Sequence, residues 1–318
     1  MRAIVLVGGH GTRLRPLTND VPKAMLPIGG VPMIERMVGH LADHGITEVV
    51  LSMGSLPGAF AEGYPDGTCA GIPLHYAVEP EPLDTAGAIA FAAAHAGIDA
   101  NSHDSFIVQN GDVLTDLDIG ALVASHRGTD VEGTIALTAV DDPSRYGVVA
   151  TDETGRVLGF VEKPAPGEAP SNLVNAGTYV LEPSVLRRIT PGVRVSVERQ
   201  VFPAMVADGT LYAMAAEASW IDAGTPATYL QANLDTLADP SGSVVDESAQ
   251  VATSAVVERS VVLAGASIGE NAVVKDSIIG PGASVGASAH VLSHSVLGTD
   301  AVVADGERLV GQLCPEVA

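Results

Sequence analysis

The chain has 318 residues, which is long enough for one large domain and a smaller one. Hydrophobic residues make up 47% and aromatic residues only 4%, so we expect a core built from Ala, Val, Leu and Ile. The formal net charge of −22 repels polyanions and argues against nucleic-acid binding.

The apolar start of the chain, residues 3–7, is too short for a membrane span and lacks the length of a signal peptide. We therefore expect a first strand there and no membrane association. The two cysteines, Cys69 and Cys314, make neither a disulfide framework nor a metal cluster. This cysteine usage predicts a reduced, cytoplasmic setting.

Short apolar runs alternate with helical patterns in the first part of the chain. The expected strands are 3–7, 48–52, 74–78 and 106–109, and the expected helices are 31–44, 86–96 and 119–126. Strands that alternate with helices pair in parallel, so this part predicts an open, Rossmann-like α/β sheet.

From Thr134 the pattern becomes strand-rich, which predicts a mixed sheet. The expected elements are strands 134–140, 148–150, 157–162, 174–181 and 211–215 and a helix at 197–207. A further helix runs to about residue 237, with Thr225 as its N-cap and Pro226 in its first turn. Residues 239–243 (DPSGS) break that helix. We therefore expect one domain over 1–238 and a second over 244–311.

The second domain has aliphatic residues at every sixth position. They are Val245, Val251 and Val257, then Ile279, Val285, Val291, Leu297 and Val303. Two five-residue steps interrupt the period, from Leu263 to Ile268 and from Val274 to Ile279. A six-residue period with one inward aliphatic per side is typical of a left-handed parallel β-helix, here with three to four coils. Its open ends and flat faces predict a homo-oligomer assembled partly through the β-helix.

A glycine-rich loop from Gly8 to Lys23 directly follows the first expected strand, and its first part is GGHGTRLRPLT. Glycines let backbone N–H groups approach phosphate oxygens closely. Arg13 and Arg15 add donors suited to a triphosphate, and Lys23 adds a point charge. The spacing matches neither a P-loop nor a dinucleotide fingerprint. The loop therefore predicts phosphate binding of another kind.

Two acidic positions stand out elsewhere. Asp112, in Asn110-Gly111-Asp112, ends the fourth expected strand at the same carboxyl edge as Gly8, where open α/β sheets bind ligands. Asp222 follows Trp220-Ile221, far away in the sequence. Two aspartates on one site would hold Mg²⁺, but spacing alone does not bring these two together.

The stretch VGGHGTRLRPLTNDVPKAMLPIGGVPMI resembles the signature of the sugar-1-phosphate nucleotidyltransferases. Within that family, FVEKP, VNAGTYVL and residues 196–224 look most like mannose-1-phosphate guanylyltransferases. The resemblance covers about residues 1–237. It implies an enzyme whose nucleotidyltransferase domain transfers a nucleotidyl group from a nucleoside triphosphate to a sugar-1-phosphate with Mg²⁺. The products are an NDP-sugar and pyrophosphate, and GTP and mannose-1-phosphate are the expected pair.

The same resemblance assigns roles to individual residues. The catalytic residues it implies are Arg13, Lys23 and Asp112, with Asp112 and Asp222 as the metal ligands. The implied nucleotide-binding residues are Leu6, Gly8, Gly9, Gly11, Thr12, Arg13, Glu79, Pro82, Thr85 and Gly87. The implied sugar-phosphate-binding residues are Asn110, Gly147, Glu162, Lys163 and Asn175. Many relatives carry Gly where this chain has Asp84, so the preference for base and sugar stays open.

Three alternatives remain at this point. The enzyme could take glucose-1-phosphate or a cyclitol phosphate with dTTP or UTP. The chain could be a non-catalytic regulatory subunit that senses an NDP-sugar, although such subunits tend to lose the loop arginine or the metal ligands, which are present here. Hexapeptide-repeat proteins are often acyltransferases, for which His290 or His294 would serve as the base. His10 lies where relatives vary, and we expect no essential role for it.

Overall fold

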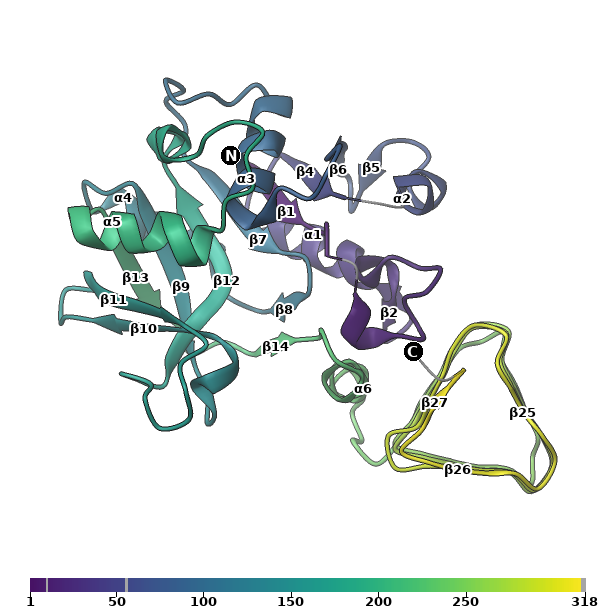
Figure 1. Ribbon diagram of the computed structural model, residues 1–318. Coiled ribbons are helices and arrows are strands. Elements are labelled where there is room, and N and C mark those ends of the chain that lie inside the picture. Colours follow the sequence, from purple (N-terminus) through teal and green to yellow (C-terminus); the bar gives the residue numbers. More distant parts are fainter. Residues whose placement is uncertain (10, 55–56, 316–318) are drawn as a thin grey trace. The chain divides into compact units, whose positions relative to one another are not determined.

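The computed structural model describes residues 1–9, 11–54 and 57–315, and the chain forms two compact units (Figure 1). The first unit consists of Met1–Gly9 and Ile34–Trp220, and the second of His10–Met33 and Ile221–Ala318. The predicted open sheet lies in the first unit and the predicted β-helix in the second. The division into 1–238 and 244–311 comes from the sequence pattern and stays a prediction.

The first unit is built on one mixed sheet. Its strands are β1 (Arg2–Leu6), β4 (Glu48–Met53), β5 (Thr68–Cys69), β6 (Ile72–Val78), β7 (Phe106–Asn110), β9 (Gly133–Ala139), β10 (Gly147–Thr151), β11 (Val157–Glu162), β12 (Leu173–Leu181) and β13 (Leu211–Ala215). The other elements include α1 (Met33–Asp43), α2 (Pro57–Gly63), α3 (Asp84–His95), β8 (Val113–Thr115), α4 (Ile119–Arg127) and α5 (Phe202–Asp208), and β14 (Trp220–Asp222) begins in this unit and ends in the second. The predicted Rossmann-like mixed sheet is confirmed.

The order of the strands fixes where a ligand can bind. Strand β1 pairs in parallel with β4 on one side and β7 on the other, so that Leu6 lies opposite both Ser52 and Asn110. Strand β12 then adds to β7 in the antiparallel sense. The chain leaves β1 toward β4 and returns to β7 on the opposite side of β1. The carboxyl ends of the neighbouring strands β1 and β7 are therefore a topological switch point, where open α/β sheets bind ligands. Both of these strands end at this edge.

Helices cover both faces of the sheet. On one face, α3 and α5 pack against Ile4 and Val108, with Ala92 and Phe202 among the buried residues of the same cluster. Residues alternate along a strand, so Thr134 of β9 faces the other way from Ile135, which belongs to that cluster. The Thr134 hydroxyl lies 2.9 Å from Nδ1 of the buried His126, which places α4 on the opposite face.

Two predicted helices begin or run differently from expectation. The helix predicted over 31–44 begins at Met33, because Val31–Pro32 (β3) pairs with Pro27–Ile28 (β2) in a short hairpin. The helix predicted over 197–207 opens with one wide π-helical turn, Val197–Val201, before α5. Strands of two or three residues and the short α2 were not predicted, since they are too short to show a hydrophobic period.

Three parallel sheets form the left-handed β-helix of the second unit. The first sheet contains β15 (Val244–Val245), β18 (Val261–Val262), β21 (Ile278–Ile279), β24 (Val296–Leu297) and β27 (Leu313–Cys314). The second contains β16 (Gln250–Val251), β19 (Ser267–Ile268), β22 (Ser284–Val285) and β25 (Val302–Val303), and the third contains β17 (Val256–Glu258), β20 (Val273–Lys275), β23 (His290–Leu292) and β26 (Arg308–Val310). The fold is as predicted: it has four full coils, the upper number expected, and one additional strand, β27.

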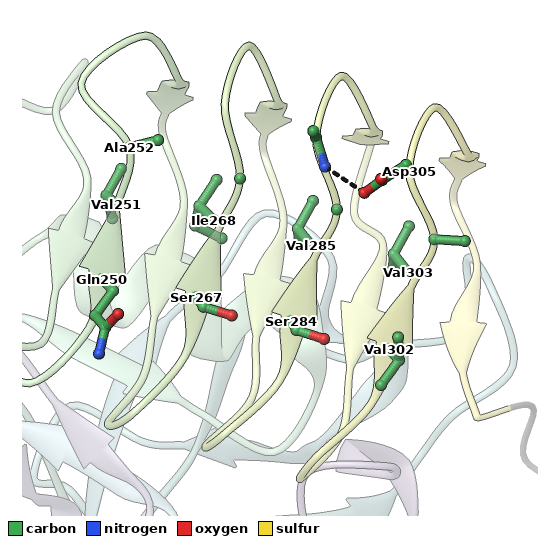
Figure 2. A pocket seen from close by; sticks show the side chains of 14 residues that line it. Gln250, Val251, Ala252, Ser267, Ile268, Ser284, Val285, Val302, Val303 and Asp305 are labelled. Atoms are coloured by element: carbon green, nitrogen blue, oxygen red, sulfur yellow. Dashed lines mark hydrogen bonds between the residues drawn. The ribbon is translucent and has the colours of Figure 1, made fainter.

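Equivalent residues of successive coils stack in columns (Figure 2). Val251, Ile268, Val285 and Val303 form one such column, and the last three are almost fully buried. Their outward neighbours include Ser267 and Ser284. Val245 pairs with Val262, so the first five-residue step falls between Val257 and Val262. The predicted step from Leu263 to Ile268 is therefore wrong by one residue, because Leu263 is also buried and aliphatic.

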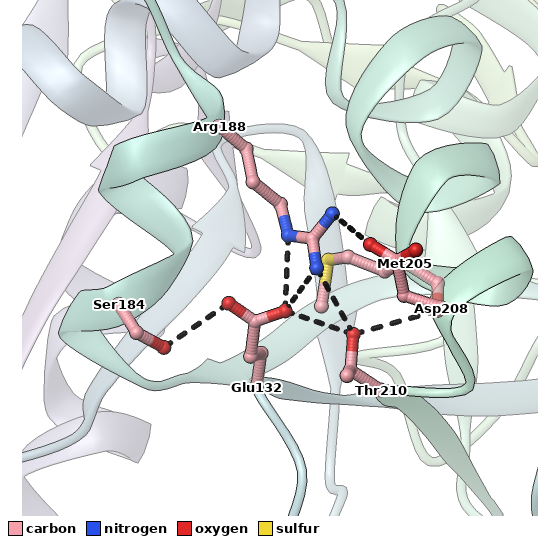
Figure 3. Close-up of polar contacts among 6 residues, drawn as sticks. All are labelled: Glu132, Ser184, Arg188, Met205, Asp208 and Thr210. Atoms are coloured by element: carbon pink, nitrogen blue, oxygen red, sulfur yellow. Dashed lines mark hydrogen bonds and ion pairs between the residues drawn. The ribbon is translucent and has the colours of Figure 1, made fainter.

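A polar cluster fastens the sheet at the edge opposite to the ends of β1 and β7 (Figure 3). Arg188 donates through Nε and Nη2 to Oε2 of Glu132, and through Nη1 to Asp208 at 2.7 Å. Ser184 and Thr210 donate to the same Glu132 carboxylate. Burial raises the pKa of Glu132, but the hydrogen bonds and charge of Arg188, with those of the two hydroxyls, outweigh it and hold the pKa below its usual 4.5.

This cluster predicts a pH-dependent loss of stability in Arg188→Met. The substitution leaves the partly buried Glu132 carboxylate without its cation, and we expect the free energy of unfolding near pH 7 to fall by about 2 kcal/mol. The folded-state pKa of Glu132 is lowered, so its contribution is present above the usual 4.5 and is lost as pH falls below that value. The difference between variant and wild type should therefore shrink in acid.

Urea denaturation at several pH values measures this difference. Arg187→Met is the matched control, because the neighbouring Arg187 is exposed and donates to Ala100 O and Asn101 Oδ1, away from Glu132. Equal losses in the two variants, or a loss in Arg188→Met that does not change with pH, would contradict the assignment.

Candidate active site

The ends of β1 and β7 approach each other closely at Gly111. The Gly111 N–H donates to Leu6 O at 2.9 Å, and a Cβ on Gly111 would lie 2.5 Å from that same oxygen. Only glycine permits this approach, since no side-chain carbon fits at that distance. As a result Asn110 and the half-buried Asp112 flank the contact to β1, as the sequence predicted for this edge of the sheet.

Gly8 and Gly9 follow β1 at the same edge. A Cβ on Gly8 would lie 3.3 Å from Gly54 N and 3.6 Å from Oε1 of Glu79, whereas a Cβ on Gly9 would meet no described atom within 4 Å. Gly8 is thus packed against its own unit, and the Cα of Gly9 borders open space. This is the arrangement that a backbone anion site requires on its ligand side.

Glu79 is a buried residue that links two segments of the first unit. Its side chain is only 7% exposed, Oε1 accepts from the Ser52 hydroxyl at 3.1 Å and Oε2 accepts from Leu83 N at 3.0 Å. The carboxylate therefore ties the segment that leads into α3 to the end of β4. Its predicted role in nucleotide binding stays a prediction, and this geometry supports a role in holding the segment that contains the exposed Pro82.

Asp84 begins α3 in a left-handed conformation, with φ of +61°. Glycine adopts this conformation without steric cost, which explains why many relatives can carry Gly here. Aspartate is tolerated because its short side chain bonds locally: Oδ1 accepts from Thr85 N at 2.8 Å, and Oδ2 lies 3.7 Å from Nε of Arg194. The departure from the family pattern is thus accommodated without breaking the turn.

Thr85 and Gly87 hold the segment that follows residue 192. The Thr85 hydroxyl donates to Glu198 at 2.7 Å and accepts from Val197 N at 2.8 Å, and Gly87 N donates to Val195 O at 3.1 Å. The first turn of α3 is therefore covered by this segment. The geometry supports a positioning role for both residues, while their contact with a nucleotide stays a prediction.

A bulge in β12 brings two predicted sugar-phosphate residues together. The register of β12 against β9 shifts between Asn175 and Tyr179, where Asn175 accepts from Gly177 N at 2.9 Å and donates to the Tyr179 hydroxyl at 3.0 Å. Gly177 has φ of +74°, and a Cβ there would lie 2.8 Å from Nδ2 of Asn110. Complete burial raises the pKa of Tyr179, so its hydroxyl stays protonated and anchors the bulge.

The β10–β11 ladder assembles the other sugar-phosphate candidates. Gly147 pairs with Glu162, and a Cβ on Gly147 would lie 3.0 Å from Oε2 of that glutamate. The Lys163 ammonium lies 3.4 Å from Oε1 of Glu162 and its side chain is 60% exposed, so it can reach a bound anion. Trp220 donates to Ala176 O at 2.9 Å and its ring meets Tyr146 edge-on.

The part of the glycine-rich loop that lies in the second unit is called the signature loop, and its described residues 11–18 form compact turns. Gly11 has φ of +60°, its carbonyl accepts from Leu14 N and from the Thr18 hydroxyl, both at 2.8 Å, and residues Thr12–Leu14 form one helical turn. Leu14 is fully buried, whereas Thr12 and Arg13 are exposed. The turn therefore presents its polar side to solvent on an anchored apolar base.

Arg13 and Asp222 meet around Gly224. A Cβ on Gly224 would lie 2.7 Å from Nη2 of Arg13 and 2.6 Å from Oδ1 of Asp222, and the same Oδ1 accepts from Gly224 N at 2.9 Å. Gly224 was not among the predicted site residues. Its signal was available, since glycine two residues after a candidate ligand marks a place where polar groups approach the backbone.

Helix α6 (Pro226–Leu234) holds the part of the signature segment that follows Lys23. The buried Tyr229 donates to Pro27 O at 2.7 Å, and the buried Asn233 accepts from Gly29 N at 2.9 Å, both in the β2–β3 hairpin. Thr225 caps α6 as predicted, in a reciprocal pair with Thr228. Tyr229 and Asn233 were missed, because a buried polar residue on a helix carries no sequence signal of its partner.

The two units thus divide the predicted site residues between them. The first unit holds Leu6, Gly8, Gly9, Glu79, Pro82, Thr85, Gly87, Asn110, Asp112, Gly147, Glu162, Lys163 and Asn175, and the second holds Gly11, Thr12, Arg13, Lys23 and Asp222. His10 lies outside the described residues.

Neither histidine proposed for acyl transfer lines the shallow hollow on the β-helix drawn in Figure 2. Its lining is mostly small and aliphatic, and Asp305 is its one titratable residue. The hollow therefore contains neither of the two histidines that were considered as the base for acyl transfer. Within the part of the chain that the structure describes, no helix has the length and apolar character needed to cross a membrane.

The fold and the sheet-edge constellation define a nucleotidyltransferase-like protein, and comparison with known proteins agrees. A family model described as "Nucleotidyl transferase" matches residues 2–239, and one described as "GMPPB C-terminal domain" matches residues 236–315. The first match covers well over half of the chain. The chain therefore belongs to the nucleotidyl transferase family.

Curated relatives and solved structures give the same picture. A mannose-1-phosphate guanylyltransferase of Mycobacterium tuberculosis is 41% identical over 73% of this chain and 64% of its own length, and a mannose-1-phosphate guanyltransferase of Schizosaccharomyces pombe is 42% identical over 72% and 62%. This chain thus spans less than two thirds of either relative. HddC from Yersinia pseudotuberculosis is 30% identical, with a TM-score of 0.63 over 74% of this chain and 99% of that one. A putative glucose-1-phosphate thymidylyltransferase from Bacillus anthracis is 27% identical, with a TM-score of 0.65 over 73% and 94%.

The crowding around Gly224 predicts that Gly224→Ala impairs catalysis. The added methyl group would displace Arg13 and Asp222, so we expect turnover to fall about tenfold or more. Gly159→Ala in β11 is the matched control, because a Cβ there meets nothing within 4 Å. The rate of pyrophosphate release measures the effect. Normal turnover in Gly224→Ala would show that the close contacts around Gly224 do not matter for catalysis.

Proposed function

We propose that this protein transfers a guanylyl group from GTP to mannose-1-phosphate, giving GDP-mannose and pyrophosphate. The observation that carries the proposal is the 40–42% identity with the first curated relatives, all named as mannose-1-phosphate guanylyl- or guanyltransferases, in the segment that contains the predicted site. A solved HddC structure with a bound ligand titled GMP-PN adds support for a guanine nucleotide.

The proposed reaction is an in-line displacement at the α-phosphorus of the triphosphate. An oxygen of the sugar phosphate forms the new P–O bond while the bond between the α-phosphorus and the bridging oxygen to the β-phosphorus breaks, and pyrophosphate leaves with that electron pair. A phosphate oxygen is already anionic near neutral pH, so no general base is needed. The protein has to position two anions that repel each other and to stabilise developing charge.

Each cation has a part in that task. Arg13 clamps the triphosphate and the leaving group, Lys23 neutralises the phosphates and Lys163 holds the attacking phosphate. The pairing of Lys163 with Glu162 at 3.4 Å keeps the ammonium beside the carboxylate proposed to bind sugar hydroxyls. With a net charge of −22 on the chain, these few cations are needed to attract anionic substrates.

The donor set also fits Mg²⁺. Magnesium takes oxygen ligands, typically one or two carboxylates with substrate phosphates and water, and Asp112 and Asp222 would supply the carboxylates. No group of three or more His, Cys, Asp or Glu side chains that could form a protein cage occurs among the described residues. When bound, the ion would neutralise charge on the phosphates. Oligomerisation through the β-helix and a cytoplasmic location complete the proposal.

A matrix of GTP, ATP, UTP and dTTP against mannose-1-phosphate, glucose-1-phosphate and a cyclitol phosphate, scored by pyrophosphate release, tests the substrates. Fastest turnover with GTP and mannose-1-phosphate is expected. A preference for dTTP or UTP with glucose-1-phosphate would replace the proposed pair while keeping the reaction. No turnover with any pair, together with binding of an NDP-sugar, would favour the regulatory-subunit alternative.

Two substitutions test the roles of individual residues. Arg13→Ala and Asp112→Ala should each lower turnover by at least about a hundredfold, the scale of losing one group that stabilises the transition state. Arg187→Ala is the control, because Arg187 is exposed, donates only to Ala100 O and Asn101 Oδ1 among the described hydrogen bonds, and has no proposed part in phosphate binding. Near-normal activity of either Arg13→Ala or Asp112→Ala would contradict the assignment.

A further inference from the structure

The β-helix and the signature loop touch directly at Gly298 and Pro16, both in the second unit. A Cβ on Gly298 would lie 2.8 Å from Cβ, 3.1 Å from Cγ and 3.3 Å from O of Pro16, and these are its three nearest atoms. Both residues are buried. Carbon atoms pack at about 3.5–4.0 Å, so this contact exists only because residue 298 has no side chain.

The preceding coil shows that this contact is specific to one level of the β-helix. Gly280 precedes Gly298 by one coil, since Ile279 pairs with Leu297. A Cβ on Gly280 would meet Leu297 O and the backbone of Gly298, so that glycine serves the stacking of coil on coil. At Gly298 the nearest neighbour is the signature loop instead. One coil is therefore shaped to receive Pro16.

The contact continues to Arg13 through short-range hydrogen bonds. Leu14 N donates to Gly11 O at 2.8 Å, and Leu17 N donates to Leu14 O at 3.0 Å, which joins the residues on either side of Pro16 into consecutive tight turns. Leu14 and Leu17 are fully buried. A shift of Pro16 therefore cannot be absorbed inside the loop and displaces the turn that carries Arg13, whose guanidinium lies against Gly224.

We propose that Gly298 is a positioning residue for the nucleotidyl transfer, because its bare backbone seats Pro16 and so sets the place of Arg13. The β-helix then contributes to catalysis by holding the signature loop in place. This inference rests on the proposed function for its kinetic readout. It does not depend on which sugar or base is used.

Two pairs of variants test the proposal in the full chain. Gly298→Ala and Gly298→Val place a side chain against Pro16 and should displace the loop by about 1 Å. Gly269→Ala and Gly269→Val are the matched controls: a Cβ on Gly269 would lie 2.7 Å from Ala287 N, so the clash stays inside the β-helix. Both glycines lie outside the left-handed region, so neither change strains φ.

The kinetic readout is pyrophosphate release with the best substrate pair. We expect kcat to fall about tenfold in Gly298→Ala and about a hundredfold in Gly298→Val, because misplacement of about 1 Å costs rate at this scale. The KM of the sugar phosphate should change little, and the Gly269 variants should keep kcat within about twofold even where they melt at lower temperature. Equal effects at both positions, or full activity of the Gly298 variants, would overturn the proposal.

Limited trypsin digestion gives a readout that does not need activity. The Arg13–Leu14 bond is protected while Leu14 is buried, and cleavage there reports local opening of the loop. We expect cleavage about tenfold faster in Gly298→Val than in Gly269→Val, measured by mass spectrometry near neutral pH. If Gly298→Val does not fold, Gly298→Ala carries the comparison against Gly269→Ala.

The two tests separate the two ideas. A wild-type protein that releases no pyrophosphate with any substrate pair would overturn the proposed function, while faster trypsin cleavage in the Gly298 variants would still support the seating of the loop. An active wild type whose Gly298 variants match the Gly269 variants in both readouts would overturn this inference alone.

Discussion

The close approach of β1 and β7 at their carboxyl ends is the constraint on which the sheet-edge half of the site depends. Gly111 N bonds to Leu6 O at 2.9 Å, and the bare Cα of Gly111 permits it. The parallel pairing of the two strands aligns Asn110 with Leu6, so the residues after both strands leave the sheet at the same level. The bulge of β12 depends on this alignment in turn, because Gly177 packs on the Asn110 side chain.

At three glycines of this protein, neighbouring groups occupy the space of a Cβ. Gly147 lies against Phe160 and Glu162, Gly224 against Arg13 and Asp222, and Gly298 against Pro16. None of these three has the positive φ that would demand glycine on conformational grounds. They are glycines because another group occupies the space of their side chain. At Gly224, for example, the absence of a side chain lets the charged groups of Arg13 and Asp222 approach the backbone.

Within the second unit, the β-helix and α6 both contact the glycine-rich segment that carries Arg13 and Lys23. The signature segment is anchored by α6 through Tyr229 and Asn233 and by the β-helix through Gly298, so three separate contacts keep its turns in place. A loop that binds phosphates must be glycine-rich and polar, and therefore supplies few apolar contacts of its own. Contacts with α6 and the β-helix hold such a loop in place where its own apolar contacts are few. At the opposite edge of the sheet, the bond between Arg188 and Glu132 contributes to stability.

The amino-acid sequence by itself determined the fold class and most of the longer strands and helices, and it supplied the predictions for the candidate site. Alternation of strands and helices predicts parallel pairing, and the six-residue period predicts a β-helix, because both patterns are local and repeat many times. The two-residue strands outside the β-helix were not predicted. The register of one coil was predicted wrongly, because Val262 and Leu263 are both apolar and only the stacking of coils shows which of them continues the column.

Only the tertiary structure decided which groups meet. The family resemblance implied nucleotide contacts for Glu79 and Thr85, and these stay predictions; the fold adds that their side chains bond to Ser52, Leu83 and Glu198. The sequence carried no signal that Arg13 approaches Gly224 or that Pro16 approaches Gly298, because in each pair the two residues lie more than about two hundred residues apart in the chain. A sequence states which chemical groups are available, and long-range packing alone brings them within a few ångströms of each other.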